Sequence, residues 1–259
     1  MNVFLTGASS GLGHALAREF ASRGARLGLV ARRRELLDEL NAQLGGRHEV
    51  YPLDVADRAA LVAAARAFER ATGGADVVVA NAGISAGMLT EFEADLDVLR
   101  EILEVNVLAM AATFHPFIAP MRARGRGRLV GIASVAGIRG LPGSAGYCAS
   151  KAAALSYCES LRVELRRTGV EVLTIAPGFV RTPMTARNPY PMPFLIDAER
   201  FARSAADAIE RGASYTVIPW PMSVVAKLLR LLPNAVFDRV LGRRAYKPRR
   251  SDAGGGPAS

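Results

Sequence analysis

Short apolar runs alternate with longer segments of helical periodicity along the first 218 residues of the chain. The runs at 76–80 and 170–175 are apolar at most positions, which is typical of strands covered on both faces. Strands are expected at 2–6, 26–31, 48–53, 76–80, 127–133, 170–176 and 215–218. Helices are expected near 12–23, 34–44, 57–71, 96–123, 147–168 and 199–211. This order predicts a single α/β domain, with a doubly wound Rossmann-type parallel sheet of about seven strands flanked by helices, and a ligand at the carboxyl ends of the strands.

The first expected strand runs directly into a glycine-rich turn. Residues 7–13 read Gly-Ala-Ser-Ser-Gly-Leu-Gly, and helical spacing follows through Leu16 and Phe20. Glycines let such a turn be tight and let its backbone approach a phosphate, while the following helix offers free N–H groups and the positive end of its dipole. In this strand–turn–helix context the turn predicts a dinucleotide site.

A candidate acid/base pair follows in the second half of the chain. Tyr147 and Lys151 are four residues apart on an expected helix, thirteen residues after Ser134. Residues at that spacing share a helix face. A free phenol titrates near pH ~10, and a neighbouring cation lowers its pKa toward the range where a general acid/base works best. Taken alone, such a pair is more often a solvated helix surface, so the interpretation depends on the rest of the chain.

Other short motifs accompany the glycine turn and the Tyr/Lys pair in a fixed order. They are Leu53-Asp54-Val55, Asn81-Ala82-Gly83, Val105-Asn106-Val107, Ser134, and Pro177-Gly178 with Thr182. With these motifs the chain resembles the short-chain dehydrogenases/reductases of the Tyr-x-x-x-Lys type, to about residue 218. One departure is Ala80, where the family often has a second asparagine before Asn-Ala-Gly. This departure affects a local hydrogen bond and leaves the chemistry intact.

The resemblance implies a role for each of four catalytic residues. Ser134 would hydrogen-bond the substrate oxygen, and Tyr147 would donate a proton to it in reduction or remove one in oxidation. Lys151 would bind the nicotinamide ribose and lower the pKa of Tyr147. Asn106 would connect Lys151 to solvent through a water. The nicotinamide cofactor carries the hydride, and the protein orients it and supplies the proton.

The residues expected to bind the cofactor come from the ends of several strands. Asp54 would receive the adenine amino group, and the segment after Pro177 would hold the carboxamide. The full expected set is Gly7, Ser9, Ser10, Gly11, Leu12, Gly13, Arg32, Arg33, Asp54, Val55, Asn81, Ala82, Gly83, Tyr147, Lys151, Pro177, Gly178, Val180 and Thr182.

Charge at the end of the second strand favours NADP(H) over NAD(H). An acidic residue there grips the adenosine ribose hydroxyls of NAD, whereas an arginine accommodates the 2′-phosphate of NADP. Here the strand ends in Ala31, and Arg32 and Arg33 follow directly. Guanidinium groups bind phosphate bidentately. The alternative is that these arginines only begin a solvated helix, but the missing carboxylate makes that interpretation weaker.

The sequence says less about the identity of the substrate than about that of the cofactor. Apolar residues around the expected pocket suit a lipophilic ketone, aldehyde or alcohol, but they could equally pack a lid near 179–200 against the body. Besides Ser134 and Tyr147, the expected substrate contacts are Ile84, Ile138 and Met184, with Met88, Leu141 and residues 190–195 nearby. Three arginines keep an anionic substrate open: Arg139, Arg181 and Arg187.

A basic extension follows the part of the chain that resembles the family. The chain has a formal net charge of +9, and residues 220–250 hold eight Lys/Arg against one acid, Asp238. Apolar residues in 219–250 are spaced as helix faces interrupted by Pro233. Such a segment could lie on an anionic membrane or pack on the body or a second subunit, and packing is favoured slightly. Nucleic-acid binding lacks a recognition motif. Residues 251–259 are rich in Gly, Ser and Pro, and disorder is expected there.

Further expectations follow from composition. No apolar run reaches the ~20 residues of a membrane span and no leader precedes the first strand, so a cytoplasmic location is expected, or a peripheral one on the inner face of a membrane. Cys148 and Cys158 are ten residues apart on one expected helix, too far for a disulfide. The three histidines show no ligand spacing, and no metal is expected.

Two functional classes stay open. The first is an NADP(H)-dependent oxidoreductase acting on a small carbonyl or alcohol. The resemblance implies a homodimer or homotetramer formed through the helices near 96–123 and 147–168. The second is a nucleotide-binding interaction protein that acts through its basic tail. The complete set of Asn106, Ser134, Tyr147 and Lys151 favours the enzyme, since a pure binding protein would need none of them together.

Overall fold

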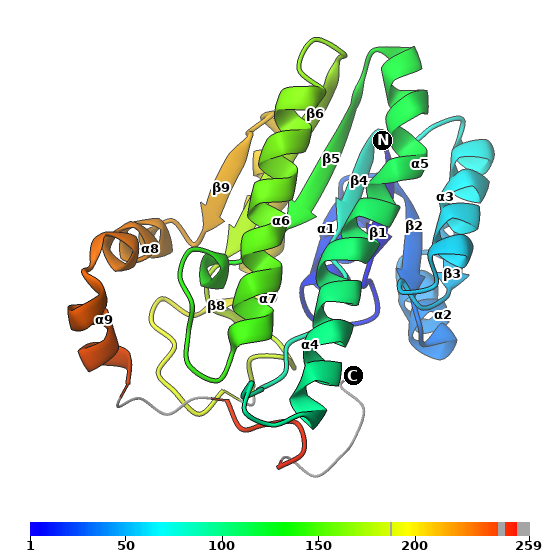
Figure 1. Ribbon diagram of the computed structural model, residues 1–259. Coiled ribbons are helices and arrows are strands. Elements are labelled where there is room, and N and C mark those ends of the chain that lie inside the picture. Colours follow the sequence, from blue (N-terminus) through cyan, green and yellow to red (C-terminus); the bar gives the residue numbers. More distant parts are fainter. Residues whose placement is uncertain (187, 243–246, 253–259) are drawn as a thin grey trace.

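The computed structural model describes residues 1–186, 188–242 and 247–252. Within these residues, seven strands form one sheet in the order β3-β2-β1-β4-β5-β6-β9, and each neighbouring pair is parallel (Figure 1). The strands are β1 (Asn2–Thr6), β2 (Arg26–Ala31), β3 (Glu49–Pro52), β4 (Val77–Ala80), β5 (Gly127–Ile132), β6 (Val170–Pro177) and β9 (Tyr215–Ile218). A separate two-stranded sheet pairs β7 (Val180–Arg181) with β8 (Ile196–Asp197). The predicted α/β architecture is confirmed.

Helices cover both faces of the sheet. The elements are α1 (Gly11–Ser22), α2 (Arg34–Gln43), α3 (Arg58–Thr72), α4 (Ala94–Leu103), α5 (Ala109–Arg124), α6 (Ala145–Glu164) and α7 (Ala198–Glu210). Side chains of β1 alternate between two cores: Val3 and Leu5 pack with α1, α2 and α7, whereas Phe4 packs with α3, α5 and α6. The Phe4 ring lies 5.5 Å from that of Phe68 and 5.1 Å from that of Phe117. Burial on both faces is the reason why the strands read as continuous apolar runs.

One long helix contains a π-helical turn. α4 continues through η1 (Glu104–Leu108) into α5 without interruption, where the sequence predicted a single helix at 96–123. By length and composition alone this helix, Ala94–Arg124, is apolar enough to cross a membrane, although it contains no unbroken apolar run of ~20 residues. The helix packs against α3, α6 and the sheet, so its apolar side chains form the core on that face.

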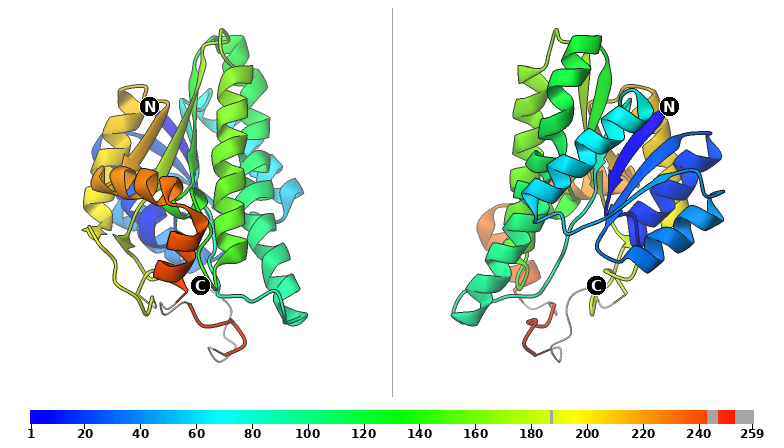
Figure 2. Two further views of the ribbon diagram at one scale, coloured as in Figure 1. Left: turned by 60° about the vertical axis from the view of Figure 1, so that its left-hand side comes forward. Right: turned by 90° about the vertical axis from the view of Figure 1, so that its right-hand side faces the viewer.

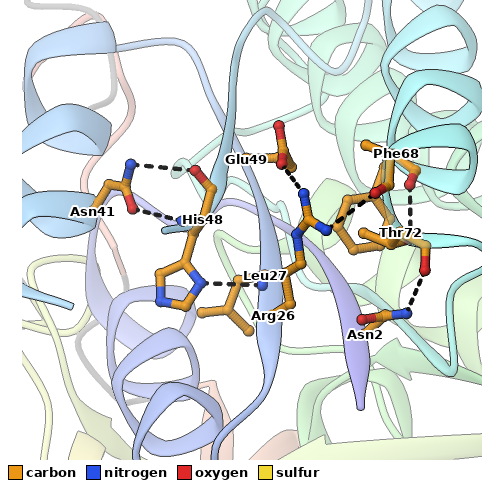
Figure 3. Close-up of polar contacts among 9 residues, drawn as sticks. Asn2, Arg26, Leu27, Asn41, His48, Glu49, Phe68 and Thr72 are labelled. Atoms are coloured by element: carbon orange, nitrogen blue, oxygen red, sulfur yellow. Dashed lines mark hydrogen bonds and ion pairs between the residues drawn. The ribbon is translucent and has the colours of Figure 1, made fainter. Parts of the chain in front are cut away.

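Side-chain hydrogen bonds join β2 to the segment just before β3 at the edge of the sheet (Figure 3). His48 Nδ1 accepts a hydrogen bond from the Leu27 N–H at 3.2 Å, and Asn41 bonds both backbone groups of His48. Burial lowers the pKa of His48, which favours the neutral ring that can accept this bond. The ion pair between Arg26 and Glu49 joins the same two strands. His48 is therefore a structural residue, as the sequence indicated.

The C-terminal extension forms two helices that pack on the body. These are α8 (Pro221–Leu231) and α9 (Asn234–Leu241), separated at Pro233 as predicted; α8 follows β9 and packs against it, and α9 comes after α8 (Figure 2, left). Phe237 is buried, and the guanidinium of Arg139 lies 3.8 Å from its ring centroid. The same guanidinium donates hydrogen bonds to the carbonyls of Leu229 and Leu232. One face of the extension is therefore docked on the body.

Candidate active site

The carboxyl ends of the central strands surround a cleft of about 650 Å³. This is the position expected for the ligand site of a parallel α/β sheet. The cleft is lined by every expected cofactor residue: Gly7, Ser9, Ser10, Gly11, Leu12, Gly13, Arg32, Arg33, Asp54, Val55, Asn81, Ala82, Gly83, Tyr147, Lys151, Pro177, Gly178, Val180 and Thr182. Ser134, Ile84 and Met184 line it as well. Residues from distant parts of the sequence thus meet around one cavity.

The glycine turn is too closely packed to accept a side chain at Gly13. A Cβ on Gly13 would lie 2.0 Å from the Gly7 carbonyl oxygen, so the start of α1 packs directly on the turn. Asn81 Nδ2 donates to the Thr6 carbonyl at 2.9 Å and holds the end of β4 against β1. At the N-terminus of α1, the Ser10 side chain makes no capping hydrogen bond, and the first turn contains no acidic residue. The backbone donors and the helix dipole at this end fit the pyrophosphate of a dinucleotide.

Ser134, Tyr147 and Lys151 lie together on the wall of the cleft. Ser134 follows β5 and begins a short 3₁₀ turn, η2 (Val135–Gly137), where its Oγ accepts a hydrogen bond from the Ala136 N–H at 3.1 Å. Tyr147 and Lys151 are in the first turns of α6, and Lys151 Nζ lies 5.8 Å from the Tyr147 ring centroid. The i, i+4 spacing therefore places both groups on the face that lines the cleft, as predicted.

Burial is the main cause of the pKa shifts of Tyr147 and Lys151. It raises the pKa of Tyr147 to about 12, and a hydrogen bond with Ser134 acts in the opposite direction with smaller effect. Burial also lowers the pKa of Lys151 to about 8. The Lys151 ammonium donates to the Ile132 carbonyl at 2.8 Å. From the sequence we expected Lys151 to lower the pKa of Tyr147, but loss of solvent around the phenol has the larger effect in this structure.

Asn106 lies in the π-helical turn and is completely buried. Its Oδ1 accepts from the Ile84 N–H at 2.8 Å, and its Nδ2 donates to the Ile84 carbonyl and to Ser150 Oγ, each at 2.9 Å. A Cβ on Gly83 would lie 3.2 Å from Asn106 Oδ1 and 3.5 Å from Lys151 Nζ, so the two polar groups flank the same glycine. Asn106 therefore ties the loop after β4 to α6 beside Lys151.

Sequence reasoning missed Ser150, the residue that connects Asn106 to α6. Ser150 is fully buried, and its Oγ donates to the Tyr147 carbonyl at 2.8 Å while accepting from Asn106. These bonds link the π-helical turn to the turn of α6 that carries the Tyr/Lys pair. The only signal in the sequence was its position directly before Lys151, and a serine beside a lysine on a helix is too common to indicate a buried hydrogen bond.

The two arginines after β2 lie where the charge argument placed them. Arg32 Nη1 is 3.9 Å from Asp54 Oδ2, and Arg33 Nη2 donates to Ser9 Oγ at 3.4 Å. All four residues line the cleft. Both arginines therefore line the cleft, and the guanidinium of Arg33 contacts the glycine turn.

Several expected substrate residues lie outside the cleft. Ile138 and Leu141 line a separate, shallow cavity beside α9, because their turn packs toward the C-terminal extension. Met88 is 1% exposed and belongs to a small apolar cluster with Ile102. Of the three arginines considered for an anionic substrate, Arg139 binds the extension and Arg181 pairs with Asp197, while Arg187 lies outside the described residues. The expectation that Ile138 contacts substrate is not supported by its position.

Fold and cleft together define a dehydrogenase of the Rossmann type, and the chain belongs to the short-chain dehydrogenase family. The family model for short chain dehydrogenases matches residues 1–191. An uncharacterized oxidoreductase of Myxococcus xanthus is 42% identical over 242 residues, covering 92% of this chain and 95% of the relative. The bovine dehydrogenase/reductase SDR family member 7B is 31% identical, covering 96% of this chain and 82% of the relative.

Solved structures show the same relationship. A short-chain dehydrogenase/reductase from Burkholderia phymatum, determined in complex with NAD, is 26% identical and superimposes with a TM-score of 0.79. The superposition covers 95% of this chain and 96% of that one. The family model matches only residues 1–191, whereas the superposition covers 95% of the chain. The shared architecture therefore continues beyond residue 191. This protein is an oxidoreductase of the short-chain dehydrogenase/reductase family.

Proposed function

We propose that this protein is an NADP(H)-dependent oxidoreductase that interconverts a ketone or aldehyde and the corresponding alcohol. The observation that carries the proposal is the convergence of Ser134, Tyr147 and Lys151 on the cleft that also holds the glycine turn. Nicotinamide cofactors supply a hydride when bound. The glycine turn, Asn81 and the start of α1 would hold the dinucleotide, and the Arg32/Arg33 pair supports NADP(H).

The side chains around the cleft bind the substrate oxygen, transfer the proton and position the cofactor. Ser134 Oγ hydrogen-bonds the substrate oxygen, and such preorganised donors contribute a few kcal/mol where charge develops. Tyr147 holds the proton that this oxygen gains in reduction. Lys151 orients the cofactor ribose, and its charge favours the phenolate when the proton has left. Asn106 and Ser150 hold the two helices in register, which keeps the lysine beside the phenol.

A turnover screen with NADPH tests the proposal. Lipophilic and polar carbonyls are compared, following NADPH absorbance, with the Tyr147→Phe protein as the blank. The cleft wall contributed by Ile84 and Met184 leads us to expect lipophilic carbonyls among the better substrates. Tight NADPH binding with no turnover over a broad screen would instead favour a nucleotide-binding interaction protein.

The outer face of the extension supports a second role at a membrane surface. Trp220, Val224, Leu228 and Leu231 recur at a spacing of three to four residues along α8, and they are 72%, 48%, 59% and 78% exposed. Packing on the body therefore uses one face of α8 and leaves another apolar face in solvent. Lys227 and Arg230 are on the same helix. An exposed apolar stripe with basic neighbours is the pattern of a helix that lies in an anionic interface. This would place a cytoplasmic enzyme peripherally on a membrane.

Charged substitutions in this stripe are expected to abolish vesicle binding. Leu228→Asp with Leu231→Asp removes apolar area and adds like charge near anionic lipid, where each Lys or Arg is worth roughly 1 kcal/mol. We expect the wild-type chain to co-sediment with vesicles of phosphatidylserine and phosphatidylcholine, and less so as salt rises. The double variant should stay in the supernatant.

Leu96→Asp is the matched control, because Leu96 is 48% exposed but lies on α4. Point variants are preferable to truncation after Pro219, which would also remove the contacts of Arg139 with the extension. If the wild-type chain ignores anionic vesicles, the stripe is not a membrane surface.

Self-association is expected through the long helices α5 and α6. Leu108, in the turn before α5, is 56% exposed, and Val163, on α6, is 61% exposed. A twofold axis would make such a face self-complementary. Sedimentation velocity at micromolar concentration should show a dimer or tetramer, and Val163→Glu should shift it toward monomer. A wild-type monomer under these conditions would rule the expectation out.

A further inference from the structure

The end of the C-terminal extension lies against the cleft. Residues 247–252, here called the strap, run along the loop after β4 and the start of α4 (Figure 1). Arg249 forms a parallel bridge with Gly87, and the Arg250 N–H donates to the Gly87 carbonyl at 3.2 Å. A Cβ on Gly87 would lie 2.0 Å from the Pro248 carbonyl oxygen, so this close approach requires glycine. Lys247 Nζ also donates to Ser85 Oγ at 3.1 Å.

A buried ion pair anchors the strap. Arg249 donates to both carboxylate oxygens of Asp95, at 2.8 and 3.2 Å, and its guanidinium lies 3.5 Å from the Phe92 ring centroid. Asp95 is only 1% exposed and also accepts from the Leu89 N–H at 2.8 Å. A bidentate pair with this burial fixes both position and direction. Removing one partner would leave an uncompensated buried charge, so the strap is held firmly.

The anchor places the neighbouring side chain, Arg250, on the wall of the catalytic cleft. Arg250 lines the same cavity as Tyr147 and Lys151. Its Nη1 is paired with Glu101 of α4, whereas Nε and Nη2 are buried without a hydrogen-bond partner. These two atoms form the edge of a guanidinium that binds carboxylate or phosphate side-on through two parallel N–H bonds. Leaving such donors unsatisfied is costly.

Neighbouring charges do not already satisfy that edge. On the same wall, Asp97 is paired with Arg100 at 2.9 Å, and Glu101 is paired through Nη1 of Arg250. The Arg250 side chain as a whole keeps 29% of its exposure. Nε and Nη2 themselves are buried, so binding a ligand at this edge requires the guanidinium to turn about its terminal torsions while the strap stays anchored through Arg249.

We propose that Arg250 binds an anionic group of a ligand in the cleft, so that the C-terminal strap forms part of the binding site. The group is a phosphate or carboxylate, supplied either by the cofactor or by an acidic carbonyl substrate. The inference rests on the proposed function only for the choice of NADPH and an aldehyde as probes. The strap thereby links the C-terminal extension to the chemistry of the cleft, and Arg250 determines ligand specificity.

Equilibrium binding to the full chain separates the two sources. Arg250→Ala is compared with Arg239→Ala, a control that removes one positive charge from an exposed position on α9. Calorimetry gives the Kd of NADPH and NADH, and then the Kd of 4-formylbenzoate and of its methyl ester for protein saturated with NADP⁺. Thermal unfolding checks that each variant is folded, and neither readout depends on turnover.

If the cofactor supplies the anion, Arg250→Ala should raise the Kd of both NADPH and NADH about tenfold. If the substrate supplies the anion, Arg250→Ala should leave the Kd of NADPH and NADH unchanged. The variant should then bind 4-formylbenzoate no more tightly than the methyl ester, whereas the wild-type chain binds it more tightly. Arg250→Lys should recover only part of either effect, because an ammonium lacks the planar fork. The proposal is overturned if Arg250→Ala changes neither the two cofactor Kd values nor the ratio of the Kd values of 4-formylbenzoate and its ester.

Should Arg250→Ala fail to fold, Arg250→Gln provides the same measurement, because it keeps most of the side-chain length and removes the charge. Unchanged binding in that variant overturns the proposal equally.

Discussion

Replacing Tyr147 with Phe is expected to lower kcat roughly 10²- to 10⁴-fold, the range for loss of a positioned general acid or base. The substitution removes only the phenolic oxygen, and the ring that lines the cleft stays. Cofactor Kd should therefore change less than about twofold, since no binding group of the backbone or of Lys151 is lost. Stopped-flow measurement of hydride transfer, together with fluorescence titration of NADPH, gives the two quantities separately.

Tyr157→Phe is the matched control. Tyr157 is on the same helix, but its ring stacks with Phe114 at 6.5 Å in the core rather than lining the cleft. It should retain kcat. Lys151→Ala should reduce both kcat and NADPH affinity, because the ammonium orients the cofactor ribose and favours the phenolate. Near-full activity of Tyr147→Phe across pH would remove Tyr147 from the acid/base role.

Replacing Arg32 with Ala is expected to weaken NADPH binding roughly 10- to 100-fold, as loss of hydrogen bonds to a charged group implies. NADH lacks the 2′-phosphate and should lose little. Arg34→Ala is the control, because Arg34 begins α2 and pairs with Asp38 outside the cleft. Kd values for both cofactors, measured at one salt concentration, give the change in preference.

A substitution at the neighbouring residue should shift the cofactor preference toward NADH. Ala31→Asp supplies the missing carboxylate at the end of β2 and should improve NADH relative to NADPH, because the acid can bind ribose hydroxyls and repels the 2′-phosphate. Equal losses for both cofactors on Arg32→Ala would contradict the assignment of the 2′-phosphate to this residue.

The sequence by itself determined those features that depend on local pattern. Strands buried on both faces show as apolar runs, and the glycine turn shows as Gly7 to Gly13, because backbone geometry there tolerates little else. The i, i+4 spacing of Tyr147 and Lys151 places both on one helix face without the help of any tertiary contact. The expected cofactor residues met around one cleft because parallel strands end at the same edge of the sheet.

Only the tertiary structure decided which distant segments cover that edge. Residues 138–141 are partly apolar, so the sequence placed them near the substrate. In the structure Ile138 and Leu141 line a different cavity together with Phe237 of α9. The local sequence of 138–141 does not indicate where α9 packs. The strap reaches Asp95 across 154 residues of sequence, so Arg250 could not be assigned to the site from its own neighbours. The high pKa of Tyr147 likewise depends on how completely the fold removes water from the phenol. Burial and long-range pairing are properties of the packed chain, whereas spacing and backbone tolerance are properties of the local sequence.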